Sequence, residues 1–328
     1  MRRKRVWRGI ALTVLAAVLV GAAVIALSVP SEAQPKITFA TTSTGAAGLI
    51  TTVIKNQKLD QKNGFTLDAP AFTPEAGQNA LVFKQVDSGI FNPIAMARAN
   101  LKGNSMRIFA PLFYNHISFV VQKDSPYKSL ADLKGKKVAT MARVTGMYNT
   151  FALVNRFRGL DIEKDYQLIM GAPPVILGLL KKKEVEMGMI FEPVTSTVLT
   201  EGQLKEIGTI SDLWRESTGK PMLMIGASAH AEWLDAHQKE ARQFTQAILD
   251  SLAYIHKNSA EVMRANKEQL GAKTDAALTL LIERMPKIIA SEWNDSVVQN
   301  LQLQVTKAVE FGLLPKVPEG TMFVNYLK

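Results

Sequence analysis

Cysteine is absent from the 328-residue sequence. The chain therefore cannot form a disulfide, a thiolate zinc or iron–sulfur site, a cysteine nucleophile or a lipid-modified cysteine. Histidine occurs only four times, without the spacing of metal ligands, so we expect neither a metal nor a cofactor. Glycine-rich phosphate and dinucleotide loops are also missing, and no pair of acidic residues stands out. These absences predict no catalytic residues and disfavour an enzyme.

A secretory signal is predicted at the N-terminus. Residues 1–8 carry five basic side chains, a nearly unbroken apolar run follows from Ile10 to Leu27, and Ser31-Glu32-Ala33 supplies small residues for cleavage. Removing residues 1–33 reduces the net charge from +10 to +6, with no basic stripe for nucleic acid. We expect a cleaved signal and a periplasmic protein that is not a lipoprotein. An uncleaved membrane anchor is the alternative, because the run is long enough to span a bilayer.

Short apolar runs alternate with segments of helical period after the signal. A strand over 36–41, a helix over 48–58 and a strand over 65–69 form the unit of a parallel sheet with crossover helices. The rhythm resumes with strands over 118–122, 136–140, 167–170, 186–191 and 204–210 and helices over 147–157 and 174–183. Helical patterns then dominate, over 231–257, 260–270, 275–284 and 295–311. The whole pattern predicts an α/β protein with C-terminal helices.

One internal similarity predicts two related halves. Residues 84–93 and 183–193 both read Lys-x-Val-acid-x-Gly, followed by apolar residues, Phe, a polar residue and Pro. Each copy fits a helix end, a turn and a short buried strand, with the Pro in the first turn of the next helix. Asn92 and Glu192 then lie at strand ends, where ligands bind in open parallel sheets. Chance similarity of two ordinary helix–turn–strand units is the alternative.

Several motifs resemble the substrate-binding proteins of ABC importers in the nitrate/sulfonate/taurine group. The strongest match is Lys123-Asp124-Ser125-Pro126 followed by SLADLKGKKVA at 129–139, which is close to that group's "kdSpiksLaDLkGKkVa". Residues 61–67, 86–89 and 192–193 resemble its "kkeGLdV", "vDxG" and "eP". Lys183 and Glu186 replace the Gly and Asp that are usual in the group, and Phe65 replaces Leu.

The resemblance implies a two-lobed periplasmic-binding-protein fold of type II, with two crossing strands as a hinge and C-terminal helices packed largely on the first lobe. The first lobe would comprise 34–122 and 223–328, and the second lobe 123–222. The crossings would be Ser118–Lys123 and roughly Met222–Ala227. The implied partners are a small-molecule ligand and the permease and ATPase of an ABC importer, with no nucleic acid. We expect a monomer that contacts a membrane only through the permease or a retained signal.

Two strand-end loops are candidates for holding an anion. Thr42-Ser43-Thr44-Gly45 precedes a helix, where hydroxyls, free N–H groups and the helix dipole favour negative charge. Thr145-Gly146 repeats the hydroxyl and the glycine in the second half, and Arg143 adds a planar donor fork suited to carboxylate or sulfonate. An ordinary N-cap and a solvated surface arginine are the alternatives.

Further candidate ligand-binding residues come from the repeat and from the expected crossing. Phe91 and Asn92 form one candidate pair, in which Asn92 would orient a polar group of the ligand. Glu192 would accept from an amine or amide, or would only stabilise a helix start. Asn115 and His116 precede the first crossing and could reach the ligand, although a lone histidine is more often a structural group.

Hydroxyls, N–H groups and an arginine favour a small anion such as a sulfonate, taurine, a carboxylate or nitrate. We therefore expect an exported solute-binding protein that captures such a solute between two lobes and delivers it to an ABC importer. A protein that binds a pyrimidine of the thiamine-precursor type, or a synthase-like enzyme of the same fold, is one alternative. A periplasmic sensor that presents its ligand to a membrane receptor is another.

Overall fold

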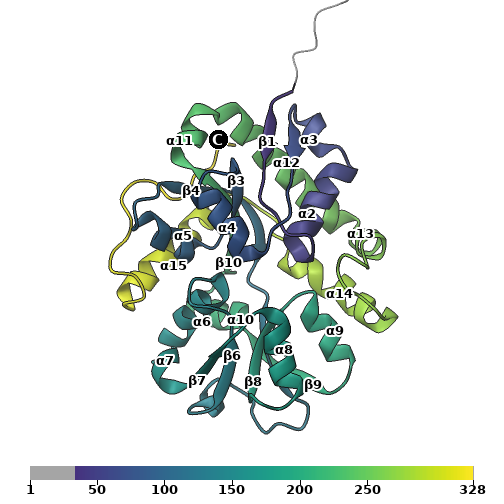
Figure 1. Ribbon diagram of the computed structural model, residues 1–328, viewed down its shortest axis with the longest axis vertical. Helices are drawn as coiled ribbons and strands as arrows, with labels where there is room; N and C mark the ends of the chain where they lie inside the picture. The colour runs from purple at the N-terminus through teal and green to yellow at the C-terminus, as the bar shows by residue number, and fades with distance from the viewer. Residues whose placement is uncertain (1–33, 328) are drawn as a thin grey trace, which may run out of the picture. The chain divides into compact units, whose positions relative to one another are not determined.

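Apolar runs alternating with amphipathic helices build two sheets, each flanked by helices (Figure 1). The computed structural model describes residues 34–327, which from Pro35 onward form one compact unit. The signal predicted at 1–33 lies outside the described residues. None of the helices in the described part of the chain combines the length and the apolar character that crossing a membrane requires. The two sheets define a first and a second lobe.

The first lobe is built on five strands. β1 (Lys36–Thr38) and β2 (Thr66–Asp68) pair in parallel, and β10 (Leu223–His230) lies antiparallel between β3 (Ser88–Phe91) and β4 (Met106–Tyr114). A bridge between Phe39 and Ser88 joins the two groups, so the order is β2-β1-β3-β10-β4. The helices between these strands are α2 (Gly45–Asn56), α3 (Leu59–Lys62), α4 (Pro74–Val82) and α5 (Pro93–Asn100).

The second lobe carries a sheet in the order β7-β6-β8-β5-β9. Its strands are β5 (Ile117–Gln122), β6 (Lys137–Thr140), β7 (Gln167–Met170), β8 (Met187–Phe191) and β9 (Leu204–Thr209). Its helices are α6 (Gly146–Arg156), α7 (Ile162–Asp165), α8 (Pro173–Lys181), α9 (Val194–Thr200) and α10 (Ile210–Thr218), with a 3₁₀ turn at Ala131–Leu133. The order repeats that of the first lobe strand by strand, and β5 takes the place that β10 has there.

The two copies of the sequence repeat fold in the same way. Lys84 and Lys183 each follow a helix, α4 or α8, and both have a left-handed backbone, with φ of 56° and 59°. Each lysine N–H donates to a leucine carbonyl, that of Leu81 or of Leu180. The glycine of the following strand lies against the side chain of that same leucine. The two copies are therefore similar in structure as well as in sequence.

The acidic residue of each copy ties the strand that follows it, β3 or β8, to the neighbouring strand β1 or β6. The Asp87 carboxylate accepts from the Thr38 N–H at 2.8 Å, across 49 residues of chain. The Glu186 carboxylate accepts from the Lys137 N–H at 2.9 Å, again across 49 residues. Both lobes thus fix the same strand pairing by the same charge-assisted hydrogen bond.

Two short segments connect the lobes. Only Asn115 and His116 separate β4 from β5, and the return passes through Met222 into β10. The Asn115 N–H donates to the Met222 carbonyl at 2.7 Å, so the segments run side by side.

The crossings expected at Ser118–Lys123 and Met222–Ala227 lie mostly within the sheets instead. β5 pairs with β8 and β9 in the second lobe, ahead of the boundary expected at residue 123, and β10 pairs with β3 and β4 in the first. That expectation was wrong because a short apolar run has the same sequence pattern whether it crosses between sheets or joins one.

The C-terminal helices are α11 (Ala231–Ala236), α12 (Gln238–Lys257), α13 (Ser259–Ala265), α14 (Asp275–Ile288) and α15 (Asp295–Glu310). The helix predicted over 231–257 is thus interrupted at His237. α12 packs on α2, α3 and β4 of the first lobe, where the Phe244 ring contacts Phe39 and Phe65 edge-on at 5.3 and 5.6 Å. The C-terminal helices were expected to pack largely on the first lobe. The packing of α14 differs, because this helix also lies against α9 of the second lobe.

Gly226 on β10 provides a test of the sheet packing in the first lobe. A Cβ at this position would lie 2.8 Å from the Ala110 carbonyl oxygen and against the Ile108 side chain. We predict that Gly226→Ala lowers the free energy of unfolding by about 2 kcal/mol, measured by urea unfolding. Gly178 on α8 has open space around it, so Gly178→Ala should instead raise that free energy by about 0.5–1 kcal/mol. A Gly226→Ala variant as stable as the parent would contradict the packing described.

Candidate ligand-binding site

The loops that follow the parallel strands of the two lobes face each other in a reciprocal way. Gly45, at the start of α2, faces the second lobe, and a Cβ there would lie 4.0 Å from Cδ of Pro193. Gly146, at the start of α6, faces the first lobe, and a Cβ there would lie 2.9 Å from Cβ of Asn92. Each lobe thus places the glycine at a helix start against a residue of the other lobe, which follows β3 in the first lobe and β8 in the second. We call this region the lobe boundary.

The start of α2 offers unsatisfied donors at the lobe boundary. Thr42 Oγ1 donates to the Thr44 carbonyl at 2.6 Å, whereas the Ser43 and Thr44 hydroxyls, which are exposed, make no hydrogen bond within residues 34–327. Thr44 is the N-cap residue, yet its side chain does not cap the helix, and no acidic residue lies in the first turn. The first N–H groups of α2 therefore have no side-chain acceptor, which favours an anion there.

The equivalent loop of the second lobe is already satisfied. Thr145 caps α6, because its hydroxyl accepts from the Tyr148 N–H and donates to the Ala142 carbonyl. Arg143 donates to both carboxylate oxygens of Glu163, at 2.8 and 2.9 Å. This pair, together with the Tyr148 hydroxyl, holds the pKa of Glu163 below its usual range. Burial and the Glu163 carboxylate raise the pKa of Tyr148 to about 12. The Arg143 guanidinium is thus occupied within its own lobe.

Asn92 is fully buried and organises the first-lobe side of the boundary. Its side-chain oxygen, Oδ1, accepts from the backbone N–H groups of Ile94 and Ala95 and so caps α5. Its amide donates to the Met224 carbonyl on the return strand at 2.9 Å. Phe91, just before it, is buried in the core. Asn92 therefore lies at a helix start, as predicted, with its carbonyl oxygen already occupied by that helix.

Glu192 is also buried, but its partner comes from a distant part of the chain. One carboxylate oxygen accepts from the Ser196 N–H at 3.1 Å, and the other pairs with Nε of Arg284 on α14 at 2.5 Å. Helix α9 begins at Val194, so Glu192 precedes the N-cap residue Pro193 rather than being it. Sequence reasoning missed Arg284, because nothing in a helical segment 92 residues away marks it as the partner of a strand end.

Asn115 and His116 fix the first crossing. The side-chain oxygen of Asn115, Oδ1, accepts from the Ile117 N–H at 3.1 Å. His116 Nδ1 donates to the Tyr114 backbone carbonyl at 3.0 Å. The His116 ring lies edge-on between Phe113 and Phe191. Burial lowers the pKa of His116 to about 4, and the positive charge of Arg284 also lowers it. The imidazole is therefore neutral at physiological pH and holds the crossing through its ring.

The lobe boundary thus gathers most of the predicted residues in distinct roles. Thr42-Ser43-Thr44-Gly45, Asn92, Gly146 and Glu192 lie on loops at this boundary, and Asn115 and His116 form the adjacent crossing. The Arg143 carbonyl also reaches it, accepting from Arg98 of the first lobe at 3.4 Å, while its side chain turns to Glu163. At the lobe boundary, the start of α2 combines exposed hydroxyls with a helix that no side chain caps.

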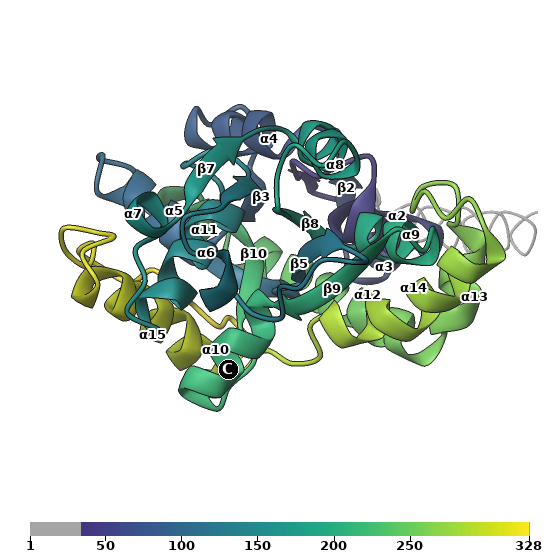
Figure 2. The same ribbon diagram turned by 90° about the horizontal axis from the view of Figure 1, so that it is seen from below.

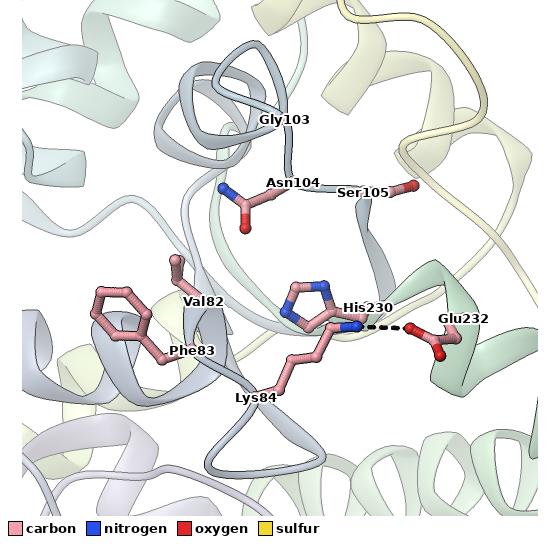
Figure 3. Close-up of a pocket in the computed structure, with 8 residues that line it drawn as sticks. All are labelled: Val82, Phe83, Lys84, Gly103, Asn104, Ser105, His230 and Glu232. Carbon is pink, nitrogen blue, oxygen red and sulfur yellow. Dashed lines mark hydrogen bonds and ion pairs between the residues drawn. The ribbon is translucent and has the colours of Figure 1, made fainter.

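A hollow lies at the ends of the first-lobe strands that are farthest from the lobe boundary, and Figure 3 shows the residues that line it. Its volume is about 340 Å³, and an adjoining hollow of about 300 Å³ shares Lys84, His230 and Glu232 with it. Lys84 and Glu232 form an ion pair at 2.6 Å, and His230 Nε2 bonds the Leu81 carbonyl at 2.8 Å. The residues that line the hollow come from the segments before β3 and β4 and from the end of the antiparallel β10. The hollow is therefore separate from the loops at the lobe boundary.

Within the described residues, histidine, aspartate and glutamate side chains nowhere gather in groups of three or more that could hold a metal ion. The arrangement at the lobe boundary instead consists of hydroxyl groups, backbone N–H groups and one paired carboxylate. Such groups can bind a solute by hydrogen bonding.

The two similar lobes joined by two crossing segments are the fold of the periplasmic binding proteins. The chain belongs to the NMT1/THI5-like family, whose model matches residues 67–262. This confirms the sequence resemblance at the level of the family. The matched segment includes the whole second lobe but not the loop at 42–45.

Solved structures of three named proteins share the fold. The alkanesulfonate-binding protein SsuA of Xanthomonas axonopodis pv. citri bound to MOPS is 15% identical, with 88% of this chain and 97% of that chain covered and a TM-score of 0.71. The periplasmic aliphatic sulphonate-binding protein SsuA of Escherichia coli is 17% identical, with 87% of this chain and 95% of that chain covered and a TM-score of 0.70. The periplasmic nitrate-binding protein NrtA of Synechocystis PCC 6803 is 17% identical, with 87% of this chain and 83% of that chain covered and a TM-score of 0.67. At these identities the likeness shows the fold alone. No curated protein matches the chain.

The buried His116 predicts an acid-sensitive hinge. Its pKa is about 4 in the folded protein against an ordinary value of 6.5, so the unfolded chain binds more protons between these values. The free energy of unfolding should therefore fall by about 3 kcal/mol as the pH falls from about 6.5 to about 4. Urea unfolding at several pH values measures this, with His116→Gln as the variant that cannot titrate. The same pH dependence in parent and variant would contradict the assignment.

Proposed function

We propose that the protein is a periplasmic solute-binding protein that holds a small anion between its two lobes and delivers it to the permease and ATPase of an ABC importer. The observation that carries the proposal is the reciprocal contact of the lobes, with Gly45 against Pro193 and Gly146 against Asn92. This contact sets the loops after the parallel strands of both lobes opposite each other, which is where ligands bind in open α/β sheets.

The start of α2 supports an anionic ligand. Ser43 and Thr44 present hydroxyls without partners among residues 34–327, and the helix start carries no capping side chain and no acid. A sulfonate or nitrate oxygen would accept from these donors and gain from the helix dipole. Proteins of the same fold named for sulfonate and nitrate binding add support to this ligand class.

The partners of Glu192 narrow the ligand class further. Both of its carboxylate oxygens are occupied, by Arg284 and by the Ser196 N–H. The ammonium group of a taurine-like ligand would therefore find no free carboxylate at this position. We infer that a plain sulfonate or another small anion binds at least as well as its amino-substituted analogue.

Binding in this arrangement needs no covalent chemistry. The ligand would bind first to the donors at the start of α2, and the second lobe would close over it through the loop at Thr145-Gly146. The two crossing segments, at Asn115-His116 and Met222, are the hinge. The ligand drives closure only through the additional contacts that it makes in the closed state.

A ligand screen by thermal unfolding tests the proposed function. The candidates are alkanesulfonates, taurine, nitrate, aromatic carboxylates and thiamine pyrimidines. Since a ligand that binds only the folded state raises its stability, we expect the anions to raise the melting temperature and ethanesulfonate to do so at least as strongly as taurine. Stabilisation by cations alone would contradict the anion site, and stabilisation by none would contradict this ligand class as a whole.

Gly146→Ala tests whether closure of the lobes matters for binding. The added Cβ would lie 2.9 Å from Asn92 Cβ, so the lobes could not approach without strain. We predict that the Kd for ethanesulfonate, measured by calorimetric titration, rises about tenfold. Gly178→Ala, also in the second lobe but in open space, is the matched control and should leave the Kd unchanged. Equal affinity of the parent and the Gly146→Ala variant would contradict a site between the lobes.

A further inference from the structure

We propose that Arg284 on α14 is a positioning residue that fastens the second lobe to the C-terminal helices when the lobes are together, and so strengthens ligand binding. This inference rests on the proposed function. It concerns a residue outside the strand-end loops, whose side chain links parts of the molecule that the two crossing segments alone would leave free to separate.

The segment that follows α14 is anchored to the first lobe. Ile289 forms a bridge with Phe113 on β4, and the Ala290 N–H donates to the Leu112 carbonyl at 3.1 Å. Arg284 is only five residues before Ile289. The backbone of Arg284 therefore cannot move far from the first lobe unless this anchor is released.

The side chain of Arg284 reaches into the second lobe. Its Nε pairs with Glu192 at 2.5 Å, and its Nη2 pairs with Glu206 on β9 at 2.7 Å. Nη2 also lies 3.5 Å from the Ser118 hydroxyl on β5. These partners come from three strands or strand ends of one sheet, and Figure 2 shows α14 beside α9 of the same lobe. The planar guanidinium can serve several partners at once, which an ammonium cannot.

The pairing has an energetic consequence for lobe separation. Glu192 is 1% exposed, and Arg284 and Glu206 are each 23% exposed, so the three charges depend on each other for solvation. Because α14 is anchored on the first lobe, opening the hinge must break these pairs or detach Ile289. In the state with the lobes together, loss of Arg284 would leave the Glu192 carboxylate buried without a cation, so the pairing favours that state over the open one in the parent relative to a variant without it.

The pairing also acts close to the candidate site. Glu192 is followed directly by Pro193, the residue that faces Gly45 at the start of α2. Holding Glu192 thus holds the second-lobe loop that opposes the donors of the first lobe. The equivalent residue of the first lobe, Asn92, is uncharged and is fixed by backbone groups of its own lobe. We call the ion pairs of Arg284 with Glu192 and Glu206 the latch. The latch has no counterpart at Asn92 in the first lobe.

The test compares variants that differ in this one link. Arg284→Gln removes the charge, and Arg284→Lys keeps it but can serve fewer partners. Arg107→Gln is the matched control, because Arg107 is 21% exposed and donates to both carboxylate oxygens of Asp235 within the first lobe. Since the chain has no cysteine, labels can be attached specifically at Lys102→Cys in the first lobe and Lys182→Cys in the second, both exposed.

Two readouts separate the latch from the proposed function. Spin-label distances without ligand should be longer and broader in Arg284→Gln than in the parent, intermediate in Arg284→Lys and unchanged in Arg107→Gln. The Kd for ethanesulfonate should rise about tenfold or more in Arg284→Gln, with a smaller rise in Arg284→Lys.

Parent-like distances and affinity in both Arg284 variants would overturn the latch. If the parent itself does not bind ethanesulfonate, the proposed sulfonate-binding function fails, while the distances still decide on the latch. If Arg284→Gln does not fold, Arg284→Lys decides, and parent-like distances in that variant would overturn the inference.

Discussion

The close approach of the two lobes at their strand-end loops is the constraint on which the rest of the site depends. Gly146 has no room for a side chain because Asn92 lies against it, and Gly45 faces Pro193 in the corresponding place. Everything else at the boundary is arranged around these contacts. Asn92 caps α5 and holds the return strand, while Asn115 joins the two crossing segments directly. The boundary is thus an interface between two α/β lobes that are joined by two short segments.

The similarity of the two lobes explains why the contacts between them are reciprocal, and the differences between the lobes indicate where ligand specificity is to be expected. The lobes share their strand order, the left-handed lysine after α4 or α8, and the acid that ties β1 to β3 in the first lobe and β6 to β8 in the second. They differ at the helix starts. Thr145 caps its helix, whereas Thr44 leaves α2 uncapped. The Glu192 carboxylate pairs with Arg284, which is 92 residues away in the sequence, whereas the Asn92 side-chain oxygen accepts from the N–H of nearby Ile94. The exposed hydroxyls at the uncapped start of α2 are therefore groups that a solute from the solvent can reach.

Local sequence patterns predicted most of the fold, and they selected residues that the structure places at the lobe boundary, where a ligand site stays a prediction. The strand over 167–170 and the helix over 295–311 are found within a residue of their expected ends, and the repeat correctly predicted two similar lobes. The crossings were misplaced because a short apolar run does not reveal which sheet it joins. The pairing of Arg143 with Glu163 and of Glu192 with Arg284 could not be predicted, since only the tertiary fold brings together partners that are 20 and 92 residues apart. Burial of charge is a property of the assembled fold.

The central claim is that one solute contacts both lobes at once, at the starts of α2 and α6. Amide chemical shifts measured by NMR during a titration with ethanesulfonate test it most directly. The account predicts saturable shifts at Gly45–Ala47 in the first lobe together with Gly146 in the second. Shifts confined to one lobe, or centred on Lys84 and Glu232 at the far edge of the first-lobe sheet, would contradict it.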